Sequence, residues 1–159
     1  MRCLYQAIIP LVVCTSALSA ETTWVVPKES QELYSVIEST PSDTYARALA
    51  QLDVDSKSCE ADIALAYENY FDVIEVIRVN GTLVNVSFSG KNRMGETFFR
   101  PKTSNGLKYL ITEFKHKKTV DVEFTHDKQW TFSASNFTRT LNSMISTCKS
   151  RKKLREQAL

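Results

Sequence analysis

The sequence predicts an α+β fold in which N-terminal helices and a C-terminal helix pack on an antiparallel sheet of four to six strands. Three observations support this prediction. Asn80-Gly81 separates two β-branched runs, residues 119–125 alternate between apolar and polar side chains, and apolar residues recur at helical spacing from Phe137 to Cys148. The length of 159 residues and the 43% hydrophobic content suit one globular domain and exclude a disordered chain.

Residues 1–20 are predicted to be a secretory signal peptide. Arg2 is the only charge in this segment, a short apolar stretch runs from Ala7 to Val13, and small residues end it at Ala20. Because a membrane-spanning helix needs about 20 apolar residues, this stretch is too short for an anchor. We therefore expect cleavage after Ala20, a mature form that does not span a membrane, and a periplasmic or secreted location.

The rest of the chain is expected to form a single α+β domain, residues 21–148, followed by a basic C-terminal tail, residues 149–159. Cys59 and Cys148 remain after cleavage, and an even pair of cysteines in an exported protein predicts a disulfide. Five basic side chains lie between Lys149 and Arg155. A solvated terminus is the favoured interpretation, and contact with phosphates, anionic lipid or an acidic partner is the alternative.

Residues 21–58 are expected to be helical. Apolar positions recur at helical spacing before Pro41 and again after Asp43, which predicts two short helices. These positions are Leu33, Val36 and Ile37, then Tyr45, Ala48, Leu49 and Leu52. Residues 60–71 fit either a helix or an extended segment, and a strand is expected to follow.

Asn80-Gly81 predicts the tight turn of a β-hairpin, because a type I′ turn needs positive φ at both central residues. The turn sets a register that pairs Ile77 with Val84 and Glu75 with Val86. One face of the hairpin is then apolar and is expected to join the core, although Glu75 interrupts it. The apolar positions are Val73, Ile77, Val79, Val84, Val86 and Phe88.

Four further strands are expected at residues 97–100, 107–114, 119–125 and 129–133. The period then changes, and an amphipathic helix capped by Ser135 or Asn136 is expected to end near the disulfide. Its apolar face consists of Phe137, Leu141, Met144, Ile145 and Cys148.

The stretch from Trp130 to Leu141 resembles the closing strand and helix of invasion-associated locus B-type periplasmic domains. Asn136 stands where those domains usually have a glycine before the phenylalanine, and the paired-cysteine pattern differs. The resemblance therefore implies no function for this chain.

The sequence contains no known catalytic or metal-binding motif, and no cofactor or metal is predicted. His116 and His126 are expected in solvated turns. Glu75 is the one carboxylate that the pattern singles out, since a carboxylate on an apolar face can serve as a general acid. A position at an edge of the sheet is the favoured alternative. Asn-x-Ser/Thr sequons, which carry glycans only in some organisms, begin at Asn80, Asn85 and Asn136.

These observations favour an exported, non-enzymatic protein-binding module, and most specifically an immunity or inhibitor protein that neutralises a periplasm-acting toxin. The alternatives are an accessory subunit of an envelope secretion, pilus or conjugation machine, and a small carboxylate-dependent hydrolase. The expected partner is another, periplasmic protein, because the net charge of +2 gives no footprint for nucleic acid. The oligomeric state stays open. The expected partner-binding residues are Lys91, Arg93, Met94, Arg100 and Lys102.

Overall fold

A computed structural model describes residues 23–24, 34–39, 48–67, 74–91, 96–125 and 128–157. The predicted signal peptide lies outside these ranges, as do Arg93, Met94 and His126. In chain order the described elements are β1 (Tyr34–Glu38), β2 (Ala48–Val54), β3 (Ala61–Tyr67), β4 (Val76–Val79), β5 (Thr82–Lys91), β6 (Thr97–Pro101), α1 (Ser104–His116), β7 (Thr119–Thr125), β8 (Lys128–Ser133) and α2 (Phe137–Gln157).

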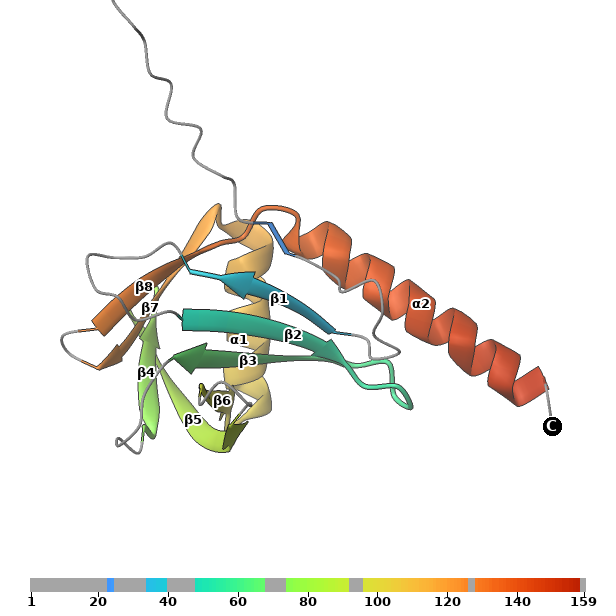
Figure 1. Cartoon of the computed structure of the whole chain (residues 1–159), viewed down its shortest axis with the longest axis horizontal. Helices are drawn as coiled ribbons and strands as arrows, with labels where there is room; N and C mark the ends of the chain where they lie inside the picture. Colours follow the sequence, from blue (N-terminus) through green and yellow to red (C-terminus); the bar gives the residue numbers. More distant parts are fainter. Residues whose placement is uncertain are drawn as a thin grey trace, which may run out of the picture.

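The eight described strands form one antiparallel sheet in the order β1-β2-β3-β6-β5-β4-β7-β8 (Figure 1). The sheet curls on itself and brings strands that are far apart in the strand order into contact. The Tyr67 ring of β3 packs against Phe124 of β7 and Trp130 of β8, with ring centroids 4.7 Å and 5.4 Å away. α1 contacts β3, β6 and β7, and α2 contacts β2 and α1. The C-terminal end of α2 extends beyond the sheet (Figure 1).

The core fills the inner side of this curled sheet. Strand side chains alternate between the two faces, so each strand contributes every second residue to the interior. Ile77 and Val79 of β4 and Val120 and Val122 of β7 are fully buried in this way. The helices add a second group of aromatic side chains, in which Trp24 lies 5.4 Å from Phe114 of α1 and 5.0 Å from Phe137 of α2 between ring centroids.

The prediction of N-terminal helices is wrong for the described residues, where Tyr34–Glu38 and Ala48–Val54 are strands. β2 buries Ala48, Ala50, Leu52 and Val54 at a period of two, and two of these four are small alanines that weaken the alternation in the sequence. The described part of the ambiguous segment 60–71 is also a strand, β3. The sheet therefore has more than the four to six strands expected.

The predicted strand at residues 107–114 is also wrong, because this segment lies within α1. The Thr103 side chain accepts a hydrogen bond from Gly106 N at 3.0 Å and so caps the helix N-terminus. Leu110 and Phe114, four residues apart, are buried on one helix face. His116, expected in a turn, is the exposed last residue of the helix.

The hairpin prediction is confirmed. Asn80 and Gly81 have φ of 45° and 85°, and Ile77 pairs with Val84. Val86 N donates to Glu75 O at 2.8 Å, as the predicted register requires. Phe88 does not join the core: its side chain is 59% exposed, beside a register shift where β5 carries one extra residue against β6.

The strands at residues 97–100, 119–125 and 129–133 and the Cys59–Cys148 disulfide are confirmed. The C-terminal helix buries Phe137, Leu141, Met144 and Cys148, as predicted. It does not end at the disulfide, however, because α2 continues through the basic segment to Gln157. Neither described helix is long and apolar enough to cross a membrane.

Candidate functional site

The outer face of β5, β4, β7 and β8 carries a row of directly paired residues. Leu83 of β5 lies opposite Arg78 of β4, and Arg78 lies opposite Glu123 of β7. Glu123 in turn lies opposite Gln129 of β8. Because the residues between them along each strand point into the core, this row faces away from the interior. The four strands therefore present one continuous surface that crosses the sheet.

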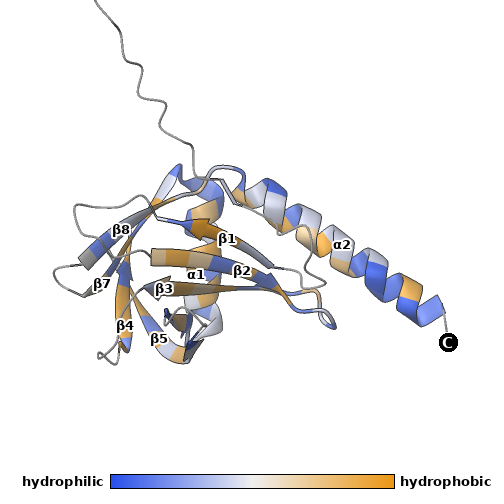
Figure 2. Ribbon diagram, viewed as in Figure 1, coloured by the Kyte–Doolittle hydropathy of each residue, from blue (hydrophilic) through white to orange (hydrophobic). Residues whose placement is uncertain are grey.

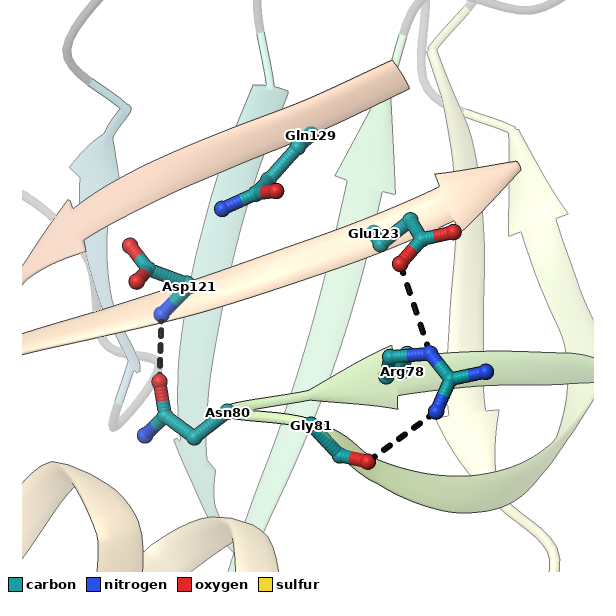
Figure 3. A pocket seen from close by; sticks show the side chains of 6 residues that line it. All are labelled: Arg78, Asn80, Gly81, Asp121, Glu123 and Gln129. Atoms are coloured by element: carbon teal, nitrogen blue, oxygen red, sulfur yellow. Dashed lines mark hydrogen bonds and ion pairs between the residues drawn. The ribbon is translucent and has the colours of Figure 1, made fainter. Parts of the chain in front are cut away.

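A depression of about 230 Å³ lies along this row (Figure 3). Arg78 is held on two sides: its Nε lies 3.4 Å from Glu123 Oε2, and its Nη1 donates to Gly81 O at 3.1 Å. Asp121 Oδ1 accepts a hydrogen bond from Thr131 Oγ1 at 2.6 Å. The depression is lined by Arg78, Asn80, Gly81, Asp121, Glu123 and Gln129.

Asn80 fixes the hairpin tip to two other elements. Its Oδ1 accepts from Asp121 N of β7 at 2.9 Å, and its Nδ2 donates to Glu113 Oε2 of α1 at 2.6 Å. The backbone N of Asn80 also donates to Asp121 O at 2.9 Å. Beside it, Tyr109 of α1 donates from its hydroxyl to Val79 O at 3.0 Å. The side of the depression formed by the turn is thus tied to α1 and β7.

The depression combines two carboxylates, Asp121 and Glu123, with one guanidinium, that of Arg78. Glu123 is paired with Arg78, and Asp121 accepts a hydrogen bond from the Thr131 hydroxyl. Because both carboxylates are paired in this way, the arrangement is suited to binding a polar group rather than to nucleophilic catalysis. Within the described ranges, no three His, Cys, Asp or Glu side chains are grouped as a metal site would require.

Apolar side chains flank the depression on the β4–β5 hairpin. Leu83 is 63% exposed and Val76 is 43% exposed, and the cross-strand pairs Arg78–Leu83 and Val76–Asn85 place both on the outer face. Protein-binding surfaces often combine exposed apolar side chains with arginine and with polar groups held in place, and this face has the same composition.

The sequence-predicted site residues do not gather in one place. Lys102 lies at the border of this surface, where its backbone N donates to Asn85 O at 2.8 Å and its Nζ is 4.0 Å from Glu75 Oε1. The Glu75 side chain is 73% exposed, so it does not interrupt the core face. Lys91 is exposed at the end of β5.

Arg100 of β6 is instead part of an ion-pair cluster that joins three strands. It donates to Asp53 Oδ2 of β2 at 2.6 Å and to Asp62 Oδ2 of β3. Partial burial disfavours its charged form, but the hydrogen bonds and charges of these aspartates outweigh burial and raise the pKa of Arg100. Its guanidinium is engaged within the sheet, which favours a structural role.

In the sequence, Asn80 stands out as a turn residue and as the start of a sequon, and the acids of residues 119–125 stand out only as polar positions of an alternating segment. The pairing of β4 with β7 brings Asn80, Arg78 and Asp121 together across more than 40 positions of the chain. Comparison with known proteins gives no match among family models, curated proteins or solved structures.

Proposed function

We propose that this chain is an exported, non-enzymatic protein-binding module that docks its partner on the outer face of β5, β4, β7 and β8. The observation that carries the proposal is the immobilised hairpin tip, where Asn80 connects the turn to α1 and β7. Polar groups beside the exposed Leu83 are thereby held in place before a partner arrives. A preorganised surface loses less conformational entropy on binding than a mobile one.

The composition of this face favours a partner with a basic side chain next to an apolar one. Asp121 and Glu123 outnumber Arg78, so the depression is suited to an incoming lysine or arginine. Leu83 and Val76 offer apolar area immediately beside it. Burial of such neighbours around a desolvated charge pair is typical of binding hot spots.

In its most specific form the proposal is an immunity or inhibitor protein that neutralises a periplasm-acting toxin. Such a protein covers its target and needs a rigid surface rather than chemistry of its own. The Cys59–Cys148 disulfide supports an oxidising compartment, in agreement with the signal peptide predicted at residues 1–20.

The edges of the sheet favour a second candidate, an accessory subunit of an envelope machine. In the described chain, β1 and β8 are the first and last strands of the sheet. These two strands lie close together without pairing, so a partner strand that inserts between them would form backbone hydrogen bonds with both. The exposed Glu75 lacks the apolar surroundings that a carboxyl general acid needs, which disfavours the hydrolase alternative.

Site-specific photocrosslinking in the native host tests the proposal. A photoreactive amino acid is introduced at Leu83 in one variant and at Lys108, exposed on α1, in a control variant. We expect a crosslink to one major protein from position 83 and none to that protein from position 108. A third variant carries the photoreactive amino acid at Glu38, exposed at the end of β1. Crosslinks to the same protein only from position 38 would favour the accessory subunit, and equal crosslinking from positions 83 and 108 would contradict the proposed face.

A further inference from the structure

We infer that the C-terminal end of α2 and the β2–β3 loop form a second binding site, which takes the carboxylate groups of an acidic polypeptide. This site is separate from the proposed docking face. A groove of about 240 Å³ lies between the helix and the loop. It is lined by Lys57, Lys152, Arg155 and Glu156.

Two different elements supply the cations around the groove. Lys57 comes from the β2–β3 loop, whereas Lys152 and Arg155 come from α2, and Glu156 is the only acid among the lining residues. Cations near a helix C-terminus are favoured by the helix dipole, which accounts in part for those on α2. The dipole does not account for Lys57, which lies on the facing loop. Positive charge on both walls therefore points to an anionic ligand.

The two walls of the groove are fastened together. Cys59 and Cys148 link the loop to α2 covalently, and Arg155 Nη2 donates to Ser56 O at 2.6 Å. The bond to Ser56 O thereby holds the guanidinium of Arg155 beside the loop. The α2 turns beyond Cys148 are exposed and add nothing to the core, yet they stay next to the loop.

The loop wall is a compact turn. Asp55 Oδ1 accepts hydrogen bonds from Lys57 N at 2.9 Å and Ser58 N at 2.7 Å, and Cys59 N donates to Asp55 O at 2.8 Å. These bonds fix the backbone that carries Lys57. The backbone of Lys57 and the guanidinium of Arg155 are therefore held in place before a ligand binds, which reduces the entropy lost on binding.

An acidic polypeptide suits this site better than a membrane surface. Figure 2 shows the last turns of α2 mainly in the blue of hydrophilic residues. Leu154, which is 66% exposed, is the one large apolar residue between Lys149 and Gln157, so these turns carry no continuous apolar face. A membrane-surface helix needs its apolar residues on one face with cations beside them. A groove, by contrast, admits individual carboxylate side chains.

Fluorescence anisotropy of the mature, disulfide-bonded protein with a labelled glutamate-rich peptide tests this inference. We expect salt-sensitive binding to this peptide and none to a glutamine-rich peptide of equal length. The double variant Lys57→Glu, Lys152→Glu should lose about tenfold in affinity, and the neutral pair Lys57→Gln, Lys152→Gln should lose less. The control Lys108→Glu, on α1, should bind like the wild type. Circular dichroism establishes that each variant is folded.

Three results would overturn the inference: no binding of the acidic peptide, equal loss in the control variant, or binding to vesicles of phosphatidylcholine and phosphatidylserine without binding to the peptide. The substitution Leu83→Glu, on the other face, separates this site from the proposed function. It should leave peptide binding unchanged, whether or not the outer face of the sheet binds a partner.

Discussion

Replacing Asn80 by alanine is expected to lower the free energy of unfolding by about 3.5 kcal/mol. The substitution removes a neutral hydrogen bond to Asp121 N and a charge-assisted one to Glu113, worth about 1 and about 1.5 kcal/mol for half-buried groups. Alanine at a φ of 45° adds about 1 kcal/mol of backbone strain, because a Cβ disfavours the left-handed region.

Urea denaturation of the wild type, Asn80→Ala and Asn80→Gly separates these contributions. Glycine loses the same side-chain bonds but tolerates positive φ, so we expect it to be about 1 kcal/mol more stable than the alanine variant. A double-mutant cycle of Asn80→Ala with Glu113→Ala should give a coupling energy of about 1.5 kcal/mol. Additivity of the two substitutions to within about 0.3 kcal/mol would refute the claim that Asn80 joins the hairpin to α1.

Three other perturbations test the rest of the fold. Replacing Cys59 and Cys148 together by alanine should cost about 4–5 kcal/mol in urea denaturation, because the disulfide closes a loop with a sequence separation of 89; an unchanged midpoint would contradict this. Phe114→Ala leaves a cavity beside Trp24, so it should lower the free energy of unfolding by about 3–5 kcal/mol and markedly lower the Tm. A Tm within about 2 °C of the wild type would argue against that packing. Hydrogen bonds from Ser58 and Lys57 hold the pKa of Asp55 below its ordinary value of 3.8. The stability they contribute is therefore present above that value and lost as the pH falls through the lowered pKa. Asp55→Ala should accordingly differ from the wild type more at pH 7 than at pH 2, and an equal difference at both would show that the charge is irrelevant.

Local signals predicted the parts of this fold that depend on neighbouring residues. The Asn80-Gly81 turn determines its own register, and the alternation in residues 119–125 is strong because valine and phenylalanine alternate with aspartate and glutamate. The apolar face of α2 is equally clear from Phe137 onward. Each of these patterns can be read within about a dozen residues, and each is confirmed.

Two segments with wrongly predicted secondary structure have an amino-acid composition that favours a different structure from the one that tertiary packing selects. Residues 107–114 contain tyrosine, isoleucine and threonine, which favour strands, but the Thr103 cap and the buried pair Leu110 and Phe114 make this segment a helix. β2 has alanines at two of its four buried positions, and alanine also favours helices. Packing against the curled sheet outweighed local propensity in both segments.

The candidate site was harder to predict than the fold because it is built by long-range pairing. Arg78 meets Glu123 only because β4 pairs with β7, and no local pattern encodes that neighbour. The amide of Asn80 likewise finds Glu113 only when α1 packs beside the turn. Arg100 was predicted as a contact residue from its charge, although Asp53 and Asp62 occupy its guanidinium.

The affinity of the partner crosslinked through position 83, measured with purified proteins, tests the central claim most directly. Loss of a buried leucine is worth about 1.5–3 kcal/mol, so Leu83→Glu should weaken binding by at least about tenfold. Lys108→Glu should bind like the wild type, because Lys108 is exposed on α1 and does not line the depression. If Leu83→Glu binds the partner as tightly as the wild type, the outer face of β5, β4, β7 and β8 is not the docking surface.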